Sequence, residues 1–358
     1  MNEDKLRTAI LGLNEQGRDL LDAALVSDCF EIEAVADTDT NLAEKTAQQY
    51  KCDAFDDYRQ LITAMDSRVS PQGRVLLVAA GLHSCDEHIR LAMKKKFNVL
   101  KLAPAARNFE EAAEMVRLSE EADVKFAVAN TDRYQESFLA FREFCRQGLI
   151  EQIFLLNAFC SFSDANNPGW LSDPKLAGGG VLLHDCYQII DQILRNLAVP
   201  RQVYSLHTNQ AQDKQQRLYL AEDTAVLTMK FSDTFIGNLI ATRREGTGEK
   251  REFLRLYGKE KIITVSRSSL TIADGKGEVC EQFEYDDDRI SCMTELLKNF
   301  AMSVISPDNN RLCSSGRENL KNMAVMESAY LSARTGFPEE PAKILQMPSG
   351  AAGMATGI

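Results

Sequence analysis

The sequence lacks three features that would assign it to particular classes of protein. It has no CxxC pair, so neither a zinc knuckle nor a dithiol redox motif is indicated. Acidic residues outnumber basic ones and give a formal net charge of -11, which argues against a general nucleic-acid or anionic-membrane surface. No apolar run approaches the length of a membrane span. We therefore expect neither a nucleic-acid nor a membrane partner, although a local basic pocket for a phosphate stays open.

The nine cysteines are scattered along the chain and form no paired framework. An odd number without regular spacing is typical of free thiols in a reducing compartment, so we expect a cytoplasmic protein. The polar start, Met1–Lys5, runs directly into a predicted strand and lacks the apolar core of a signal peptide. No group of His, Cys, Asp and Glu has metal-ligand spacing, so no metal site is expected.

The first 130 residues alternate short apolar runs with helical patterns. Near-continuous apolar strands between helices are typical of a parallel sheet covered on both faces. We expect a Rossmann-type, doubly wound α/β domain over residues 1–130. The predicted strands are residues 7–13, 30–36, 74–80, 98–102 and 125–129, and the predicted helices are 16–26, 41–50, 58–65, 86–96 and 110–122.

After residue 130 the pattern changes to longer alternating strands, which predict an α+β domain over residues 131–345 with a large, mostly antiparallel open sheet. Alternation in residues 224–243 leaves one face of this sheet needing cover, so we expect a homodimer or homotetramer. Residues 346–358 are predicted to be a disordered tail. The predicted strands are 152–162, 202–209, 224–231, 235–243, 252–257 and 261–265, and the predicted helices are 135–147, 292–305 and 315–333.

A glycine-containing turn, residues 12–17 (GLNEQG), falls between the first predicted strand and helix. A dinucleotide fingerprint occupies that place: Gly12 permits the tight turn, and Gly17 permits close packing of helix on strand. Asn14 holds the middle position, where glycine normally lets the backbone approach the pyrophosphate. Asparagine tolerates unusual backbone angles, but its side chain intrudes where phosphate oxygens would lie. We expect dinucleotide binding weakened by Asn14; an ordinary strand–helix turn is the alternative.

Asp37 ends the second predicted strand. Its distance from Gly12 is typical of a carboxylate that accepts hydrogen bonds from an adenosine ribose. Thr38 and Asp39 follow, and neither is a basic partner for a 2′-phosphate, so NAD is favoured over NADP as cofactor. A solvated loop aspartate is the alternative.

Three consecutive glycines, Gly178–Gly180, open an apolar helical run that continues to Leu194. Consecutive glycines are expected where the backbone approaches a ligand or another segment closely. His184 and Gln188 are one helical turn apart in this run, a spacing that places both side chains on one helix face. The segment therefore predicts one wall of a cleft that carries an imidazole and an amide.

In the order of its motifs the chain resembles the glucose–fructose oxidoreductase / inositol dehydrogenase (Gfo/Idh/MocA) family, over about residues 5–345. This resemblance implies an oxidoreductase that uses NAD on a sugar, cyclitol or related polyol. Its markers besides the Gly12 turn and Asp37 are Ala79–His83, Asn98–Ala106, Thr131–Tyr134, Trp170–Asp191 and Glu222–Ala225.

The residues that carry the family's chemistry are changed here. Family enzymes use the lysine of a Glu-Lys-Pro motif, and the corresponding positions read Leu102, Ala103 and Pro104. Lys101 lies two residues before Ala103, on the same face of an extended strand, and is a candidate to replace the missing lysine. The alternative is that Lys101 is a solvated or phosphate-facing lysine.

His184 stands where the family has its catalytic aspartate, and Gln188 where it has its histidine. As a catalytic group His184 would be a neutral general base near physiological pH; a histidine satisfied by a structural neighbour is the alternative. Gln188 can hydrogen-bond a substrate but cannot carry a proton.

The resemblance places further residues at the two ligands. We expect Ala79, Ala80 and His83 at the cofactor, and Arg133, Tyr134, Trp170 and Asp185 at the substrate. The alternative for His83 is a role on the loop surface, and the alternative for Arg133 is an ion pair.

Two functions remain open at this point. One is an NAD-dependent oxidoreductase in which His184 is the base and Lys101, Gln188 and Arg133 position the substrate. The other is a catalytically inactive descendant that binds or senses a nucleotide or sugar derivative. The missing lysine and histidine favour the second function, whereas Asp37 and the three glycines favour a surviving ligand site.

Overall fold

The computed structural model describes residues 5–71, 73–162, 169–211, 220–244 and 251–347. The chain divides into two compact units, neither of which is one continuous stretch of sequence. Unit 1 comprises residues 1–105, 111–131 and 288–319, and unit 2 comprises residues 106–110, 132–287 and 320–358. From the sequence we expect one continuous domain over residues 1–130 and a second over residues 131–345. The assignment of the cofactor to the first and the substrate to the second stays a prediction. From residue 348 on, the predicted tail lies outside the described residues.

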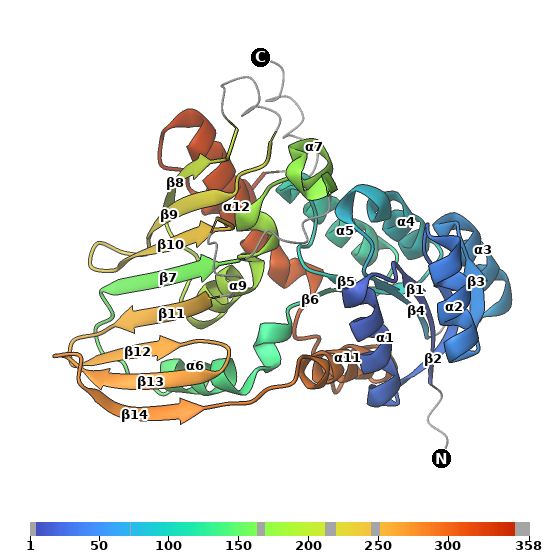
Figure 1. The fold of residues 1–358 in the computed structure, drawn as a ribbon, viewed down its shortest axis with the longest axis horizontal. Coiled ribbons are helices and arrows are strands. Elements are labelled where there is room, and N and C mark those ends of the chain that lie inside the picture. Colours follow the sequence, from blue (N-terminus) through green and yellow to red (C-terminus); the bar gives the residue numbers. More distant parts are fainter. Residues whose placement is uncertain (1–4, 72, 163–168, 212–219, 245–250, 348–358) are drawn as a thin grey trace. The chain divides into compact units, whose positions relative to one another are not determined.

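Unit 1 is built on a six-stranded parallel sheet, sheet A, which confirms the predicted Rossmann-type layout (Figure 1). The strand order is β3-β2-β1-β4-β5-β6. β2 and β3 therefore lie on one side of β1, and β4, β5 and β6 lie on its other side. Four strands of this sheet are buried along almost their whole length, as expected for a sheet covered on both faces. The strands are β1 (Leu6–Leu11), β2 (Phe30–Ala36), β3 (Asp53–Phe55), β4 (Arg74–Val78), β5 (Asn98–Leu102) and β6 (Phe126–Ala129).

Five helices follow the strands of sheet A in sequence, and a sixth comes from the distant C-terminal region. That sixth helix, α11, packs against α1 and β6, with Leu297 and Phe300 completely buried. The helices are α1 (Glu15–Ser27), α2 (Thr40–Tyr50), α3 (Tyr58–Arg68), α4 (Leu82–Lys94), α5 (Phe109–Glu121) and α11 (Arg289–Ile305).

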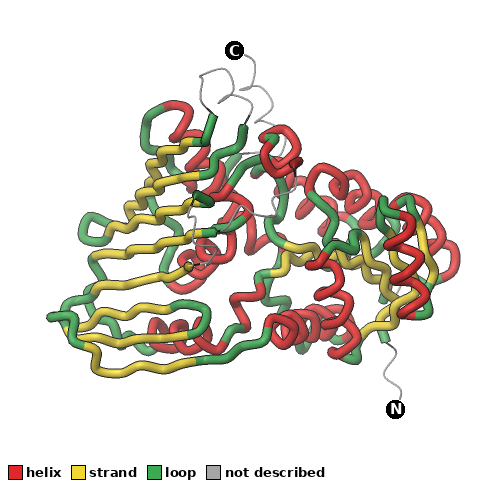
Figure 2. Tube along the Cα trace, in the orientation of Figure 1, coloured by secondary structure: helices red, strands yellow, loops and turns green. Residues whose placement is uncertain are grey.

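Unit 2 contains an eight-stranded sheet, sheet B, in the order β14-β13-β12-β11-β7-β10-β9-β8. Figure 2 shows the strands of this sheet in yellow. All neighbours pair antiparallel except β10 and β7, which confirms the predicted large, mostly antiparallel sheet. The strands are β7 (Leu155–Ser161), β8 (Gln202–Thr208), β9 (Thr224–Lys230), β10 (Ile236–Thr242), β11 (Arg251–Tyr257), β12 (Lys261–Val265), β13 (Ser269–Asp274) and β14 (Val279–Glu284).

Two helices of unit 2 contact sheet B: α6 lies against β12 and β13, and α8 lies against β9 and β10. Most of α12 also belongs to this unit. The helical elements are η1 (Thr131–Tyr134), α6 (Glu136–Arg146), η2 (Gly169–Ser172), α7 (Pro174–Ala177), α8 (Val181–His184), α9 (Tyr187–Asn196), α12 (Gly316–Thr335) and α13 (Pro341–Leu345).

Three strands were not predicted, and two of them, β3 and β14, have a weak sequence pattern. β3 has only three residues, and every residue of β14 is exposed, so neither shows an alternation of apolar and polar side chains. β13 was also missed, although Leu270 and Ile272 alternate with polar residues in it.

The glycine segment is not one continuous helix, and in this respect the prediction was wrong. The main-chain oxygen of Val181 accepts hydrogen bonds from the main-chain nitrogens of both Asp185 and Cys186. The second of these bonds spans five residues instead of four and so shifts the helical register. His184 therefore ends α8, and Gln188 lies on a second helix, α9.

Candidate functional site: two groups of residues

The turn between β1 and α1 in unit 1 requires glycine at two positions. Gly12 has a φ of +86°, and a β-carbon added to it would lie 2.5 Å from the main-chain nitrogen of Ala80. A β-carbon on Gly17 would lie 2.1 Å from the main-chain oxygen of Gly12. Both glycines thus allow the strand, the turn and the helix to approach more closely than any side chain permits.

Asn14 has ordinary backbone angles, with φ of -58°, so the middle position needs no special tolerance. Its side chain caps α1: Oδ1 accepts a hydrogen bond from the main-chain nitrogen of Gly17 at 2.9 Å, and Nδ2 donates to the main-chain oxygen of Ala79 at 3.3 Å. The amide therefore occupies a helix N–H group that a phosphate could otherwise use. Weakened dinucleotide binding stays a prediction.

Asp37 is held at the carboxyl end of β2 by two main-chain donors. Its Oδ2 accepts from the nitrogen of Leu13 at 2.7 Å, and its Oδ1 accepts from the nitrogen of Asp39 at 3.0 Å. Because a carboxylate oxygen has more than one acceptor site, both oxygens can still accept hydrogen bonds from a diol. Thr38 and Asp39 are exposed beside it and bring no positive charge.

The end of β4 lies against the end of β1. The main-chain nitrogens of Ala79 and Ala80 both donate to the oxygen of Leu11, at 2.8 and 3.0 Å. His83 is exposed in the first turn of α4. Because parallel strands end at the same edge of their sheet, these residues share that edge with the Gly12 turn and Asp37.

Lys101 is buried in β5, with only 1% of its surface exposed, so the interpretation of a solvated or phosphate-facing lysine was wrong. Its Nζ donates to the main-chain oxygens of Pro104 and Ala105 at 2.8 and 2.9 Å. Burial lowers the pKa of Lys101. The peptide bond between Ala103 and Pro104 is cis.

In unit 2, the three glycines are explained by the close approach of other segments. A β-carbon on Gly178 would lie 2.3 Å from the main-chain oxygen of Arg107. The same addition to Gly179 would lie 2.0 Å from the hydroxyl of Tyr330, and to Gly180 1.9 Å from the main-chain oxygen of Glu222. Of the two reasons expected for consecutive glycines, packing against another segment is the one that the described residues show.

Glu222 fastens this glycine segment. Its carboxylate accepts from the main-chain nitrogens of Gly180 and Leu182, at 2.8 and 3.1 Å, and from the hydroxyl of Tyr330 at 2.8 Å. Its main-chain oxygen accepts from the nitrogen of Val181 at 2.9 Å. Burial raises the pKa of the Glu222 carboxyl, and these donors oppose that rise. The sequence marked Glu222 as part of a family motif but gave it no role.

His184 is half-buried at the end of α8. Its Nε2 lies 2.9 Å from the main-chain oxygen of Ala177, and its ring meets the Trp170 ring edge to face at 5.7 Å. A carbonyl oxygen only accepts, so this contact places a proton on Nε2 and makes Nδ1 the basic nitrogen of the neutral ring. Gln188 is half-buried near the start of α9.

Two of the predicted substrate residues form ion pairs. Arg133 donates through Nε and a terminal nitrogen to both oxygens of Asp191, each at 2.7 Å, and both side chains are buried. Asn322 donates to the same carboxylate. Asp185 accepts from Nε of Arg243 at 2.6 Å. In this structure Arg133 thus has the ion-pair role, and its role toward a substrate stays a prediction, as do those of Tyr134 and Trp170.

Both units of the chain match models of known protein families. The model of the oxidoreductase family with an NAD-binding Rossmann fold matches residues 6–130, and that of the Gfo/Idh/MocA C-terminal domain matches residues 138–264. The chain belongs to the Gfo/Idh/MocA family. No curated protein sequence matches it at a significant level.

Solved structures of low sequence identity share the Gfo/Idh/MocA fold over almost the whole chain. An inositol dehydrogenase homologue from Azotobacter vinelandii, complexed with NAD+, has a TM-score of 0.84 at 16% identity and covers 94% of this chain and 98% of its own. Levoglucosan dehydrogenase with NADH and levoglucosan has a TM-score of 0.82 at 15% identity, and the match covers 94% of this chain and 99% of that chain. The WlbA dehydrogenase from Bordetella pertussis with NADH and UDP-GlcNAcA has a TM-score of 0.78 at 16% identity, and the match covers 94% of this chain and 98% of that chain.

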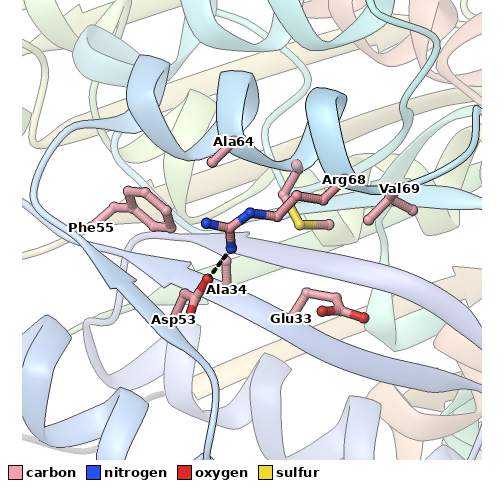
Figure 3. A pocket seen from close by; sticks show the side chains of 8 residues that line it. Glu33, Ala34, Asp53, Phe55, Ala64, Arg68 and Val69 are labelled. Carbon is pink, nitrogen blue, oxygen red and sulfur yellow. Dashed lines mark hydrogen bonds and ion pairs between the residues drawn. The ribbon is translucent and has the colours of Figure 1, made fainter.

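Other parts of the described chain offer less chemistry. A small cavity of unit 1 lies between β2, β3 and α3, where Arg68 forms an ion pair with Asp53 (Figure 3). It contains none of the predicted site residues. Among the described residues no group of three His, Cys, Asp or Glu side chains is arranged to hold a metal. Within the same residues, none of the helices has both the length and the apolar character needed to cross a membrane.

The glycine segment is connected through Tyr330 to a half-buried histidine, His207. The rings of Tyr330 and His207 meet edge to face at 5.1 Å, and His207 Nε2 lies 2.8 Å from the hydroxyl of Ser205. Burial lowers the pKa of His207 to about 4.

This histidine should make the stability of the protein dependent on pH. Since the unfolded chain protonates His207 near pH 6.5 and the folded chain near pH 4, the stabilisation is complete above pH 6.5 and is lost as pH falls towards 4. We expect His207→Gln to reduce the loss of unfolding free energy between pH 7 and pH 4 by roughly 2–3 kcal/mol. Denaturant unfolding at pH 7 and at pH 4 measures this loss of unfolding free energy. His83→Gln, which changes an exposed histidine, is the control. An unchanged pH dependence in His207→Gln would contradict the prediction.

Proposed function

We propose that this chain is an NAD-dependent oxidoreductase that acts on a sugar, cyclitol or related polyol through an atypical set of chemical groups. The observation that carries the proposal is the Gly12 turn with Asp37 fixed beside it, within an NAD-binding fold. Solved structures of the same fold were obtained with levoglucosan, UDP-GlcNAcA or L-tartaric acid, which supports a polyhydroxylated substrate. In this proposal residues 1–130 hold the cofactor, and residues 131–345 hold the substrate and associate with a second copy.

The residues present fit the adenosine and pyrophosphate parts of NAD. The Asp37 carboxylate would accept the ribose hydroxyls, and the first turn of α1 would face the pyrophosphate. Asn14 narrows that approach but leaves the other N–H groups of the turn in place. Bound NAD would supply the hydride acceptor for oxidation of an alcohol.

In unit 2 the proposed base is His184. With its proton on Nε2 towards Ala177, the imidazole can take up the proton of a substrate hydroxyl at Nδ1. Gln188 would orient the substrate by hydrogen bonds without carrying a proton. Trp170, in contact with the imidazole, would restrict its rotation.

A binding or sensing protein without turnover is the second candidate. The observation that favours it is the family's lysine position, where Ala103 has no group able to polarise a hydroxyl. The burial of the Lys101 side chain and its hydrogen bonds to main-chain oxygens argue against Lys101 as a replacement for that lysine. The chain would then keep the ligand sites without the complete chemistry.

The free cysteines support a reducing compartment, so we propose a cytoplasmic location.

Asp37→Ala tests the cofactor assignment. We expect it to weaken NAD binding by about tenfold or more, because charge-assisted hydrogen bonds to the ribose are lost. NADP binding should weaken less, since a carboxylate that repels a 2′-phosphate is removed as well. Calorimetric titration measures both, with Asp56→Ala, an exposed aspartate after β3, as control. Wild-type protein that binds no dinucleotide at millimolar concentration would sink the proposal.

His184→Ala tests the chemistry. We expect turnover of sugars and cyclitols by the wild-type chain to be very low, because two acid–base groups that each contribute about a hundred- to ten-thousand-fold are missing. His184→Ala should abolish what remains while leaving NAD affinity unchanged.

The double variant Ala103→Lys, Gln188→His separates the two candidate functions. Turnover that appears only in this variant would identify the natural protein as a binding protein. Robust wild-type turnover that survives His184→Ala would refute the assignment of the base.

One face of sheet B is proposed as the surface of self-association. Leu206, Val226 and Ile240 are exposed by 59%, 38% and 36%, and the pairing registers place them directly opposite one another on β8, β9 and β10. An apolar row across three strands is unfavourable in water and is typical of an interface.

Val226→Glu should disrupt this association, because a carboxylate would be buried at the interface without a partner. We expect sedimentation at micromolar concentration to show a dimer or tetramer for the wild-type chain and a monomer for the variant. Val26→Glu makes the same change at an exposed position of α1 and should have no effect. A monomeric wild-type protein would contradict the proposal.

A further inference from the structure

Lys101 is a buried lysine whose hydrogen bonds go to main-chain oxygens, and the carboxylates of Asp86 and Glu111 act on its amine electrostatically. Its polar contacts are the main-chain oxygens of Pro104 and Ala105, at 2.8 and 2.9 Å, and only 1% of its surface is exposed. Removing an ammonium group from water is unfavourable unless a counter-ion compensates it. A methionine would fill a similar space without that cost, so packing alone does not explain why a lysine stands at this position.

The two acceptors belong to a turn that has no polar side chain of its own. After Leu102 at the end of β5, the chain continues as Ala103, Pro104, Ala105 and Ala106. Methyl groups and a proline ring cannot hydrogen-bond, so Lys101 is the side chain that ties this turn to the strand beneath it. The long lysine side chain spans the distance from the interior of the strand to the turn.

The order of sheet A places this turn relative to the proposed dinucleotide. Asp37 ends β2, and the Gly12 turn ends β1, so the adenosine and pyrophosphate parts lie over these two strands. β4 follows on the other side of β1, and β5 is next to β4. The remaining half of the dinucleotide, which carries the nicotinamide, therefore extends towards the carboxyl ends of β4 and β5.

We infer that Lys101 is a positioning residue for the nicotinamide half of the cofactor: its ammonium group fixes the turn Leu102–Ala105 against which that half is bound. The inference rests on the proposed function. In this role Lys101 does not touch the reacting atoms and does not replace the lysine of the family motif. It acts through the main-chain oxygens that it holds.

Comparison of two ligands tests this role. NAD contains both halves of the dinucleotide, whereas ADP-ribose keeps the adenosine, the pyrophosphate and the second ribose and lacks only the nicotinamide ring. We expect Lys101→Met to weaken NAD binding by about tenfold, the effect of losing a buried hydrogen bond that orders the turn. ADP-ribose affinity should stay within about twofold of the wild-type value, because Asp37 and the Gly12 turn are unchanged. Calorimetric titration of both ligands measures this split.

Lys96→Met is the matched control. Lys96 also donates from Nζ to a main-chain oxygen, that of Ala122, but it is exposed and precedes β5 at the opposite edge of the sheet. The substitution Lys96→Met should leave the affinities for NAD and for ADP-ribose unchanged. If thermal unfolding shows that Lys101→Met does not fold, Lys101→Gln keeps a polar donor in the strand and should show the same split to a smaller extent.

The outcomes are distinguishable. Equal weakening of NAD and ADP-ribose, or no change in either, would overturn the positioning role while leaving the proposed function intact. A wild-type protein that binds neither ligand would remove the proposed function, and this inference with it.

Discussion

The contact between Gly180 and Glu222 is the constraint on which the candidate chemistry of unit 2 depends. Here two segments of the main chain lie so close that no side chain fits between them, and the Glu222 carboxylate accepts hydrogen bonds from the buried main-chain nitrogens of Gly180 and Leu182. The segment leads directly into α8, which ends at His184. The position of the imidazole is thus set by backbone packing and by one buried carboxylate.

Unit 1 uses the same principle with different partners. Gly12 lies against Ala80, and Gly17 against Gly12, so the strand ends and α1 converge at one edge of sheet A. The side chains that face this edge, Asn14 and Asp37, are themselves bonded to main-chain groups of neighbouring turns. Asn14, Asp37 and His184 are thus each held by a hydrogen bond to the main chain, which fixes their orientation before a ligand binds.

The sequence was sufficient for the architecture and for the family because these depend on patterns repeated over many residues. Apolar strands alternating with helices predicted every strand of sheet A except β3, and longer alternating strands predicted most of sheet B. The two glycine motifs marked the places of close approach because only glycine fits there. The sequence could not show that Val181 accepts two hydrogen bonds, which separates His184 from Gln188 by a break between helices.

Side-chain environments were also beyond the sequence. Lys101 has the same spacing from Ala103 whether it faces water or the interior, and only the packing of β5 between β4 and β6 decides that it is buried. Likewise, Arg133 and Asp191 are far apart in sequence, and no local pattern indicates that they form a bidentate pair. Arg243 and Tyr330 were missed for the same reason.

The packing of α11 on α1 has a consequence for how the protein is made. A ribosome completes all six strands of sheet A early, but the buried side chains of α11, including Leu297 and Phe300, emerge only near the end of synthesis. Until then, the surface of α1 that α11 covers has no partner from its own unit. The nucleotide-binding unit therefore begins first and finishes almost last, and most of unit 2 must be translated in between.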